Sequence, residues 1–75
     1  MNEETFNVSV RQFLKKFGIT AQREIERAVG AGIESGALSG REVLPVRATL
    51  TIPGLLEPLH IDGEIALTGS VPPAS

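Results

Sequence analysis

Apolar residues in the first part of the chain recur at the spacing of a helix. Between Glu3 and Phe17 they fall at i, i+4, i+7, i+8 and i+11, so they share one helical face: Phe6, Val10, Phe13, Leu14 and Phe17. Asn2 can cap the start of this helix, and Gly18 can be the residue that ends it. The pattern therefore predicts a first helix that stops at Gly18.

A second helix is expected to begin after Thr20, a good N-cap residue, and to end at Gly36. Because only Gly18 and Ile19 separate the two segments, they should fold back on each other as a short helical corner. Small residues recur at every fourth position of the second segment, which would let another element approach closely: Ala28, Gly32 and Gly36.

The period of the apolar pattern then changes from 3.6 to 2. Apolar and polar residues alternate in Val46–Ile52 and again in Leu59–Leu67, which is typical of half-buried strands. The connecting loop, Pro53–Pro58, is longer than a tight turn, and its prolines mark where the ladder stops. These segments predict an antiparallel hairpin, and Glu42–Val46 is left open as either strand or loop.

The alternation also suggests a register for this hairpin. A simple antiparallel pairing places Ile52 opposite Leu59, which keeps the apolar residues on one face. The same register sets Arg47 opposite Glu64, and this oppositely charged pair supports it.

Together these elements indicate the α+β class, with two N-terminal helices packed on a C-terminal antiparallel β-hairpin (ααββ). The sequence predicts one domain over residues 1–68 and a flexible C-terminal tail over residues 69–75. A two-stranded hairpin is marginal in water and leaves a strand edge open. Leu55 and Leu56, at the hairpin tip, are expected to be exposed. We therefore expect a partner, most simply a second copy.

The composition limits the classes of function. The chain has 75 residues and no cysteine, which excludes a disulfide and a thiolate metal site. Its formal net charge is −2 with mixed signs, so no overall field steers it to nucleic acid or to an anionic membrane. It has neither the pattern of a signal peptide nor an apolar run of about 18 residues, which favours a cytoplasmic location without a membrane.

Few residues offer chemistry. His60 is the single histidine, and it forms an i, i+2 pair with Asp62 on one face of the expected strand. This pair could bind zinc with a third ligand such as Glu64, or act as a base and its orienting group, but a solvated pair is the better-supported interpretation. Residues 30–36 read G-x-G-x-x-x-G within a helix, which differs from the dinucleotide fingerprint. We therefore assign no catalytic residue, cofactor or metal, and predict that the protein is not an enzyme.

Five cations form a candidate basic patch at the expected helical corner: Arg11, Lys15, Lys16, Arg23 and Arg27. A helical corner followed by a hairpin invites comparison with a winged helix-turn-helix. The comparison is poor, because a third helix is missing and the hairpin tip carries no cation. A solvated set of charges is favoured over phosphate contact.

One set of positions, spread over both expected helices and the second strand, forms a pattern with a known counterpart: Met1–Asn7, Ser9, Arg11, Phe13–Lys15, Gly18, Thr20, Gln22–Glu26, Ala28, Val29, Asp62–Ile65 and Leu67. In these residues the chain resembles a known family of small, uncharacterised bacterial proteins, mostly from proteobacteria. The resemblance covers about residues 1–68. It implies a bacterial origin and a self-contained domain, and it brings no activity and no catalytic residue.

The leading hypothesis is a small non-enzymatic interaction or structural module, which forms a homodimer through the open strand edge or through Leu55 and Leu56 at the tip. The alternative is a nucleic-acid-binding module that uses the basic patch. An enzyme or metal protein centred on His60 has the least support.

Overall fold

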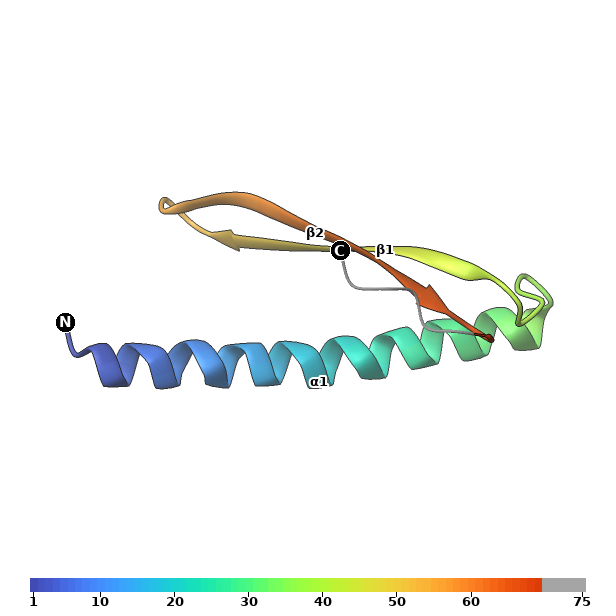
Figure 1. Ribbon diagram of the computed structural model, residues 1–75, viewed down its shortest axis with the longest axis horizontal. Helices are drawn as coiled ribbons and strands as arrows, with labels where there is room; N and C mark the ends of the chain where they lie inside the picture. Colours follow the sequence, from blue (N-terminus) through green and yellow to red (C-terminus); the bar gives the residue numbers. More distant parts are fainter. Residues whose placement is uncertain (70–75) are drawn as a thin grey trace. The chain divides into compact units, whose positions relative to one another are not determined.

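A computed structural model describes residues 1–69 and contains three elements, in the order α1 (Glu3–Ser35), β1 (Val43–Ile52) and β2 (Leu56–Ala66). The chain divides into two structural units, of which the first is Met1–Ala37 and the second begins at Leu38. One unit is therefore the helix and the other is an antiparallel hairpin (Figure 1). The expected α+β class is confirmed. Except for Gly69, the tail expected over residues 69–75 lies outside the described residues.

The expectation of two helices is wrong, because α1 runs through Gly18 and Ile19 without a break (Figure 1). Gly18 has no positive φ angle, so it does not end a helix in the left-handed conformation. Glycine costs about 1 kcal/mol relative to alanine in a helix interior, whereas a break would leave eight backbone groups without helical partners. The apolar spacing also continues in phase from Phe17 to Ala21 and Ile25, which favours one helix.

The two ends of α1 lie where the capping residues predict. The Asn2 side-chain oxygen accepts a hydrogen bond of 2.9 Å from the Thr5 backbone N–H. Gly36 has a φ of 83°, and its N–H donates to the Ile33 carbonyl at 3.2 Å. Side-chain capping at the start and a left-handed glycine at the end satisfy backbone groups that the helix itself cannot.

The hairpin turn is tighter than the sequence suggested. Leu55 N–H donates to the Ile52 carbonyl at 3.0 Å, and Gly54 has a φ of 75°. Proline followed by a glycine with positive φ is the signature of a type II turn, so Pro53 and Gly54 form its two central positions. Strand β2 can then begin at Leu56, and β1 already begins at Val43, which settles the open question of Glu42–Val46 in favour of strand from Val43 onward.

The shorter turn changes the register of the hairpin. Arg47 lies opposite Asp62 rather than Glu64, and Leu50 rather than Ile52 lies opposite Leu59. The expected register was therefore wrong by two residues. A shift of two preserves the period of the side chains, so the alternation is kept although the cross-strand partners change. An irregularity between Leu50 and Ile52 lets Ile52 pair with Leu56 next to the turn.

The two prolines within the strands sit where a missing N–H does no harm. Leu67 N–H donates to the Glu42 carbonyl, so alternate residues of β1 counted from Glu42 face the partner strand. By this alternation, Pro45 in β1 and Pro58 in β2 fall at positions whose backbone faces outward. Proline is tolerated there, and it interrupts the row of donors that an open strand edge presents.

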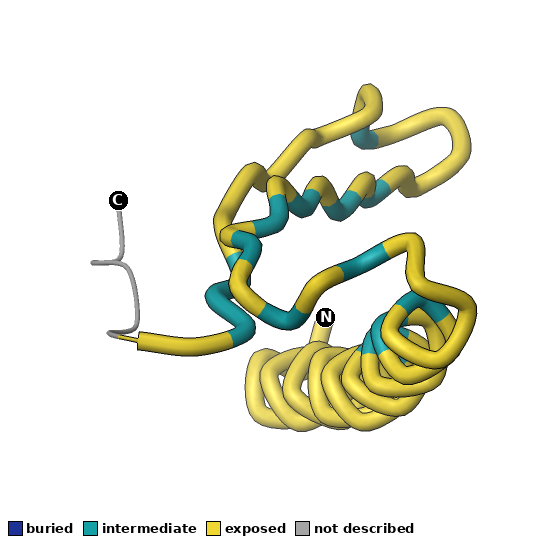
Figure 2. The backbone as a smooth tube through the Cα atoms, turned by 90° about the vertical axis from the view of Figure 1, so that its right-hand side faces the viewer, coloured by how far each residue is buried: buried dark blue, intermediate teal, exposed yellow. Residues whose placement is uncertain are grey.

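No residue among those that the structure describes is buried. In β1 every second residue from Leu44 to Leu50 is half-buried, as the alternating colours of Figure 2 show. The first twenty residues of the chain, which include the N-terminal half of α1 and all three phenylalanines, are exposed. Each unit thus presents apolar side chains to solvent, and neither contains a closed core of its own.

Candidate interaction surfaces

The longest apolar surface is a stripe along α1. Eight residues three or four positions apart form it, and we call it the helix stripe: Phe6, Val10, Phe13, Phe17, Ala21, Ile25, Ala28 and Gly32. Its large side chains at the N-terminal end are 39 to 51% exposed. Leu14, Val29 and Ile33 flank it on one side. The sequence pattern identified the first half of this stripe and the small residues Ala28 and Gly32 of the second, but it did not join them into one surface, because the first helix was expected to end at Gly18.

Aromatic side chains reinforce one another in the N-terminal half of the stripe. The rings of Phe13 and Phe17 are stacked, with centroids 6.5 Å apart and planes inclined by 22°. They are one helical turn apart, which is the spacing at which side chains on a helix meet. The pair forms a preorganised apolar ridge, because stacking holds the rings in place before any partner arrives.

The helix is longer than either strand of the hairpin. A helix of 33 residues extends about 50 Å at 1.5 Å per residue. A strand of 11 residues extends about 37 Å at most. The helix stripe, from Phe6 to Gly32, takes up about 39 Å of the length of α1.

The hairpin tip offers a smaller apolar surface than the sequence suggested. Leu55 is 82% exposed, whereas Leu56 is half-buried and pairs with Ile52. The expectation of exposure thus holds for Leu55 and is wrong for Leu56, because β2 begins one residue after the turn. A single exposed leucine remains at the tip.

The outward positions of the hairpin carry polar pairs across the strands. Arg47 Nε and Nη2 donate to the two carboxylate oxygens of Asp62 at 2.6 and 3.3 Å. Thr49 Oγ1 and His60 Nδ1 lie 3.0 Å apart. Both pairs occupy positions without ladder hydrogen bonds, where opposite side chains approach most closely. The Arg47 hydrogen bond lowers the pKa of the Asp62 carboxyl below its usual value.

These partners bear on the metal and base hypotheses for this face. His60 faces Thr49 and Asp62 is bonded to Arg47, so each of the two side chains already has a polar neighbour. Within residues 1–69, no three His, Asp or Glu side chains gather closely enough to hold a metal ion. The structure adds no third ligand to the His60–Asp62 pair.

A carboxylate organises the connector that precedes β1. The Glu42 side chain accepts backbone N–H bonds from Ser39, Gly40 and Arg41 at 2.8, 3.0 and 3.1 Å. Backbone N–H groups, above all that of Ser39, lower the pKa of the Glu42 carboxyl below its usual value. Three converging N–H donors hold this turn in one conformation, so Glu42 has a structural role that its sequence context did not reveal.

The five cations of the candidate basic patch all lie on α1, but the corner that would have gathered them does not exist. From Arg11 to Arg27 they extend along about 24 Å of helix. Arg27 forms an ion pair of 3.4 Å with Glu24. The cations are therefore spread along one helix, and carboxylates lie among them only between Arg23 and Arg27, at Glu24 and Glu26.

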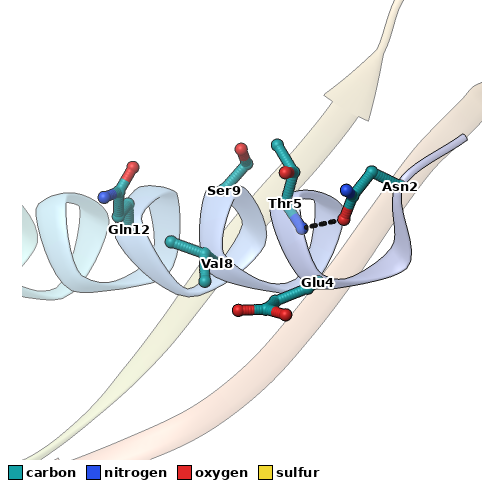
Figure 3. A pocket seen from close by; sticks show the side chains of 6 residues that line it. All are labelled: Asn2, Glu4, Thr5, Val8, Ser9 and Gln12. Atoms are coloured by element: carbon teal, nitrogen blue, oxygen red, sulfur yellow. Dashed lines mark hydrogen bonds between the residues drawn. The ribbon is translucent and has the colours of Figure 1, made fainter.

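A shallow groove at the start of α1 is lined by six exposed residues, most of them polar (Figure 3): Asn2, Glu4, Thr5, Val8, Ser9 and Gln12. All six belong to the helix or its cap, and the groove is open to solvent. The Asn2–Thr5 bond drawn there is the N-terminal cap, so the polar groups of the groove are explained by capping and solvent exposure.

The fold is thus a long amphipathic helix followed by a β-hairpin, and within residues 1–69 no helix is long and apolar enough to cross a membrane. The chain matches the family of unknown function DUF6494 over residues 1–68, and it belongs to that family. The expected resemblance to an uncharacterised family is confirmed over the same residues. Comparisons with curated proteins and with solved structures find no match.

Proposed function

We propose that this protein is a small self-associating interaction module, and that the helix stripe is its main binding surface. The observation that carries the proposal is a 33-residue helix whose apolar face contains no buried side chain. Helices in proteins derive most of their stability from packing an amphipathic face, and α1 also contains three glycines, which weaken it. A helix of this kind needs a partner to become stable.

The exposed apolar area reaches the lower limit of what a specific dimer interface requires. The three phenylalanines are 44 to 51% exposed, and each offers about 200 Å² in total. With Val10, Leu14 and Ile33 the exposed area is on the order of 500 Å² per chain. Two copies would bury about 1,000 Å², which is the lower limit for a biological interface. We therefore name a second copy of the chain as the partner.

The hairpin surfaces that the sequence suggested are weaker candidates. Pro45 and Pro58 each interrupt one outward-facing edge, which disfavours pairing with a further strand. At the tip, Leu55 alone is strongly exposed. Edge and tip contacts stay predictions, and they would add to an interface that the helix stripe forms.

Molar mass measured by light scattering over a wide concentration range tests the proposal. We expect the mass to rise from the 8.0 kDa of one chain to twice that value as concentration increases. Changing Leu55 to Ser should leave this curve nearly unchanged, whereas changing Phe13 to Ser should shift it to higher concentration. A mass of 8.0 kDa at millimolar concentration would refute self-association.

Nucleic-acid binding remains the alternative function, and it has less support from the structure than from the sequence alone. It requires a concentrated basic surface, and the cations of α1 are spread along the helix and mixed with Glu24 and Glu26. A titration with DNA or RNA at low salt, followed by NMR, tests it. Shifts that disappear when Lys15 and Lys16 are neutralised would favour this alternative.

The proposal of a self-associating module includes the homodimeric state and a cytoplasmic location.

A further inference from the structure

The spacing of the helix stripe is the same in both directions. From Phe6 to Gly32 the steps between its residues are 4, 3, 4, 4, 4, 3 and 4. A surface with this property can meet a copy of itself that runs the opposite way, because each stripe position then lies level with another stripe position. The centre of the sequence of steps is at the level of Ile19, near the middle of α1.

The sizes of the side chains also fit this arrangement. Reversal about Ile19 brings Phe17 level with Ala21, Val10 with Ala28 and Phe6 with Gly32. Three of the four levels thus combine a larger residue with a smaller one. At the remaining level, Phe13 meets Ile25. Facing large and small residues let two helices interdigitate at a uniform separation.

A parallel pair would place identical residues side by side. Phenylalanine would meet phenylalanine at three levels in the first half, and alanine or glycine would meet itself at three levels in the second. Helix separation follows the size of the contacting side chains, within about 8–10 Å. The two halves would demand different separations, which leaves voids in the half with small residues.

We propose that two copies of this chain pair through the helix stripe in antiparallel orientation, about a two-fold axis at the level of Ile19. The inference rests on the proposed function, since it takes self-association through α1 as given, and it adds the orientation and register. In such an isologous pair the helix stripe of each copy covers that of the other, so the assembly is closed as a dimer.

The same spacing indicates how the helices cross. The seven steps of the stripe advance 26 positions along the chain, from Phe6 to Gly32, which is about 3.7 residues per turn. This value is close to that of an 11-residue repeat and above the 3.5 of a heptad. The pair therefore winds gently with a right-handed sense and is not a heptad coiled coil.

Distances between spin labels test the orientation in the full chain. The sequence contains no cysteine, so Thr5→Cys and Ile19→Cys each give one labelling site per chain, and both residues are exposed. In the antiparallel pair, position 5 of one copy lies level with position 33 of the other. The two labels at position 5 are therefore about 42 Å apart along the helix axis. The two labels at position 19 lie at the same level. The distance at position 5 should therefore exceed that at position 19 by about 20 Å or more.

The two possible failures are distinguishable. If the distances at positions 5 and 19 agree within a few ångström, the helices are parallel, which overturns the proposed orientation and leaves self-association intact. If neither variant, nor the unlabelled chain in light scattering, shows association, both the orientation and the proposed function are refuted. Circular dichroism of each labelled variant checks that the helix is retained.

Discussion

Replacing Phe17 by Ala is the most direct test of the helix stripe. Phe17 is 44% exposed, so about 90 Å² of its surface is free to bind a partner if a phenylalanine offers about 200 Å². A symmetric dimer contains two copies of the residue and would bury about 180 Å² in total. At about 25 cal/mol per Å², this burial contributes at most about 4.5 kcal/mol to association. Since alanine retains part of it, we expect a loss of about 2–4 kcal/mol.

A loss of this size raises the dissociation constant by about 30- to 1,000-fold. Sedimentation equilibrium over three decades of concentration measures it directly. The matched control is Ile19→Ala, because Ile19 is 50% exposed on the same helix and lies off the stripe. Both substitutions introduce alanine and so favour helix formation in the same direction. Equal effects of the two variants, or no effect of Phe17→Ala, would refute the assignment of the stripe.

Three further outcomes follow from the geometry. Gly18→Ala should stabilise the helix by up to about 1 kcal/mol, because a Cβ there meets no atom within 4 Å. Gly36→Ala should destabilise the helix, because φ at this position is 83°. Thermal unfolding followed by circular dichroism at 222 nm compares the two variants. Phe17→Ala and Ala21→Phe should each weaken the dimer, and the double variant should recover part of the loss in sedimentation, since the two positions face each other only in an antiparallel pair. The Asp62 carboxyl has a lowered pKa, so its ion pair with Arg47 stabilises the hairpin fully at any pH above the ordinary aspartate pKa of about 3.9. This stabilisation is lost as the pH falls through the lowered pKa of Asp62. Asp62→Asn should abolish that acid response in an NMR titration, and an unchanged response would show that another carboxylate causes it.

Local signals in the sequence were sufficient for the ends of the helix and for the hairpin. Asn2 and Gly36 mark the two ends of α1, since each provides a capping geometry that few other residues can. The alternation of apolar residues defined the strands, since side-chain direction has a period of two. The register could not be derived in the same way, because a shift of two residues leaves the alternation unchanged. Pro53 and Gly54 were the available signal, as their order specifies a type II turn and thus a short loop.

Gly18 shows why the interaction surface was harder to predict than the fold. A glycine that closely follows two lysines, here Lys15 and Lys16, resembles a helix end, and local preference alone favours a stop there. The cost of glycine within a helix is only about 1 kcal/mol, so the backbone bonds gained by continuing outweigh it. The phase of the apolar residues decides the matter, because Phe17, Ala21 and Ile25 follow the same face across the glycine. Once the helix is continuous, two short apolar faces become one stripe about 40 Å long, and the symmetric spacing on which the antiparallel pair rests exists only in that continuous helix.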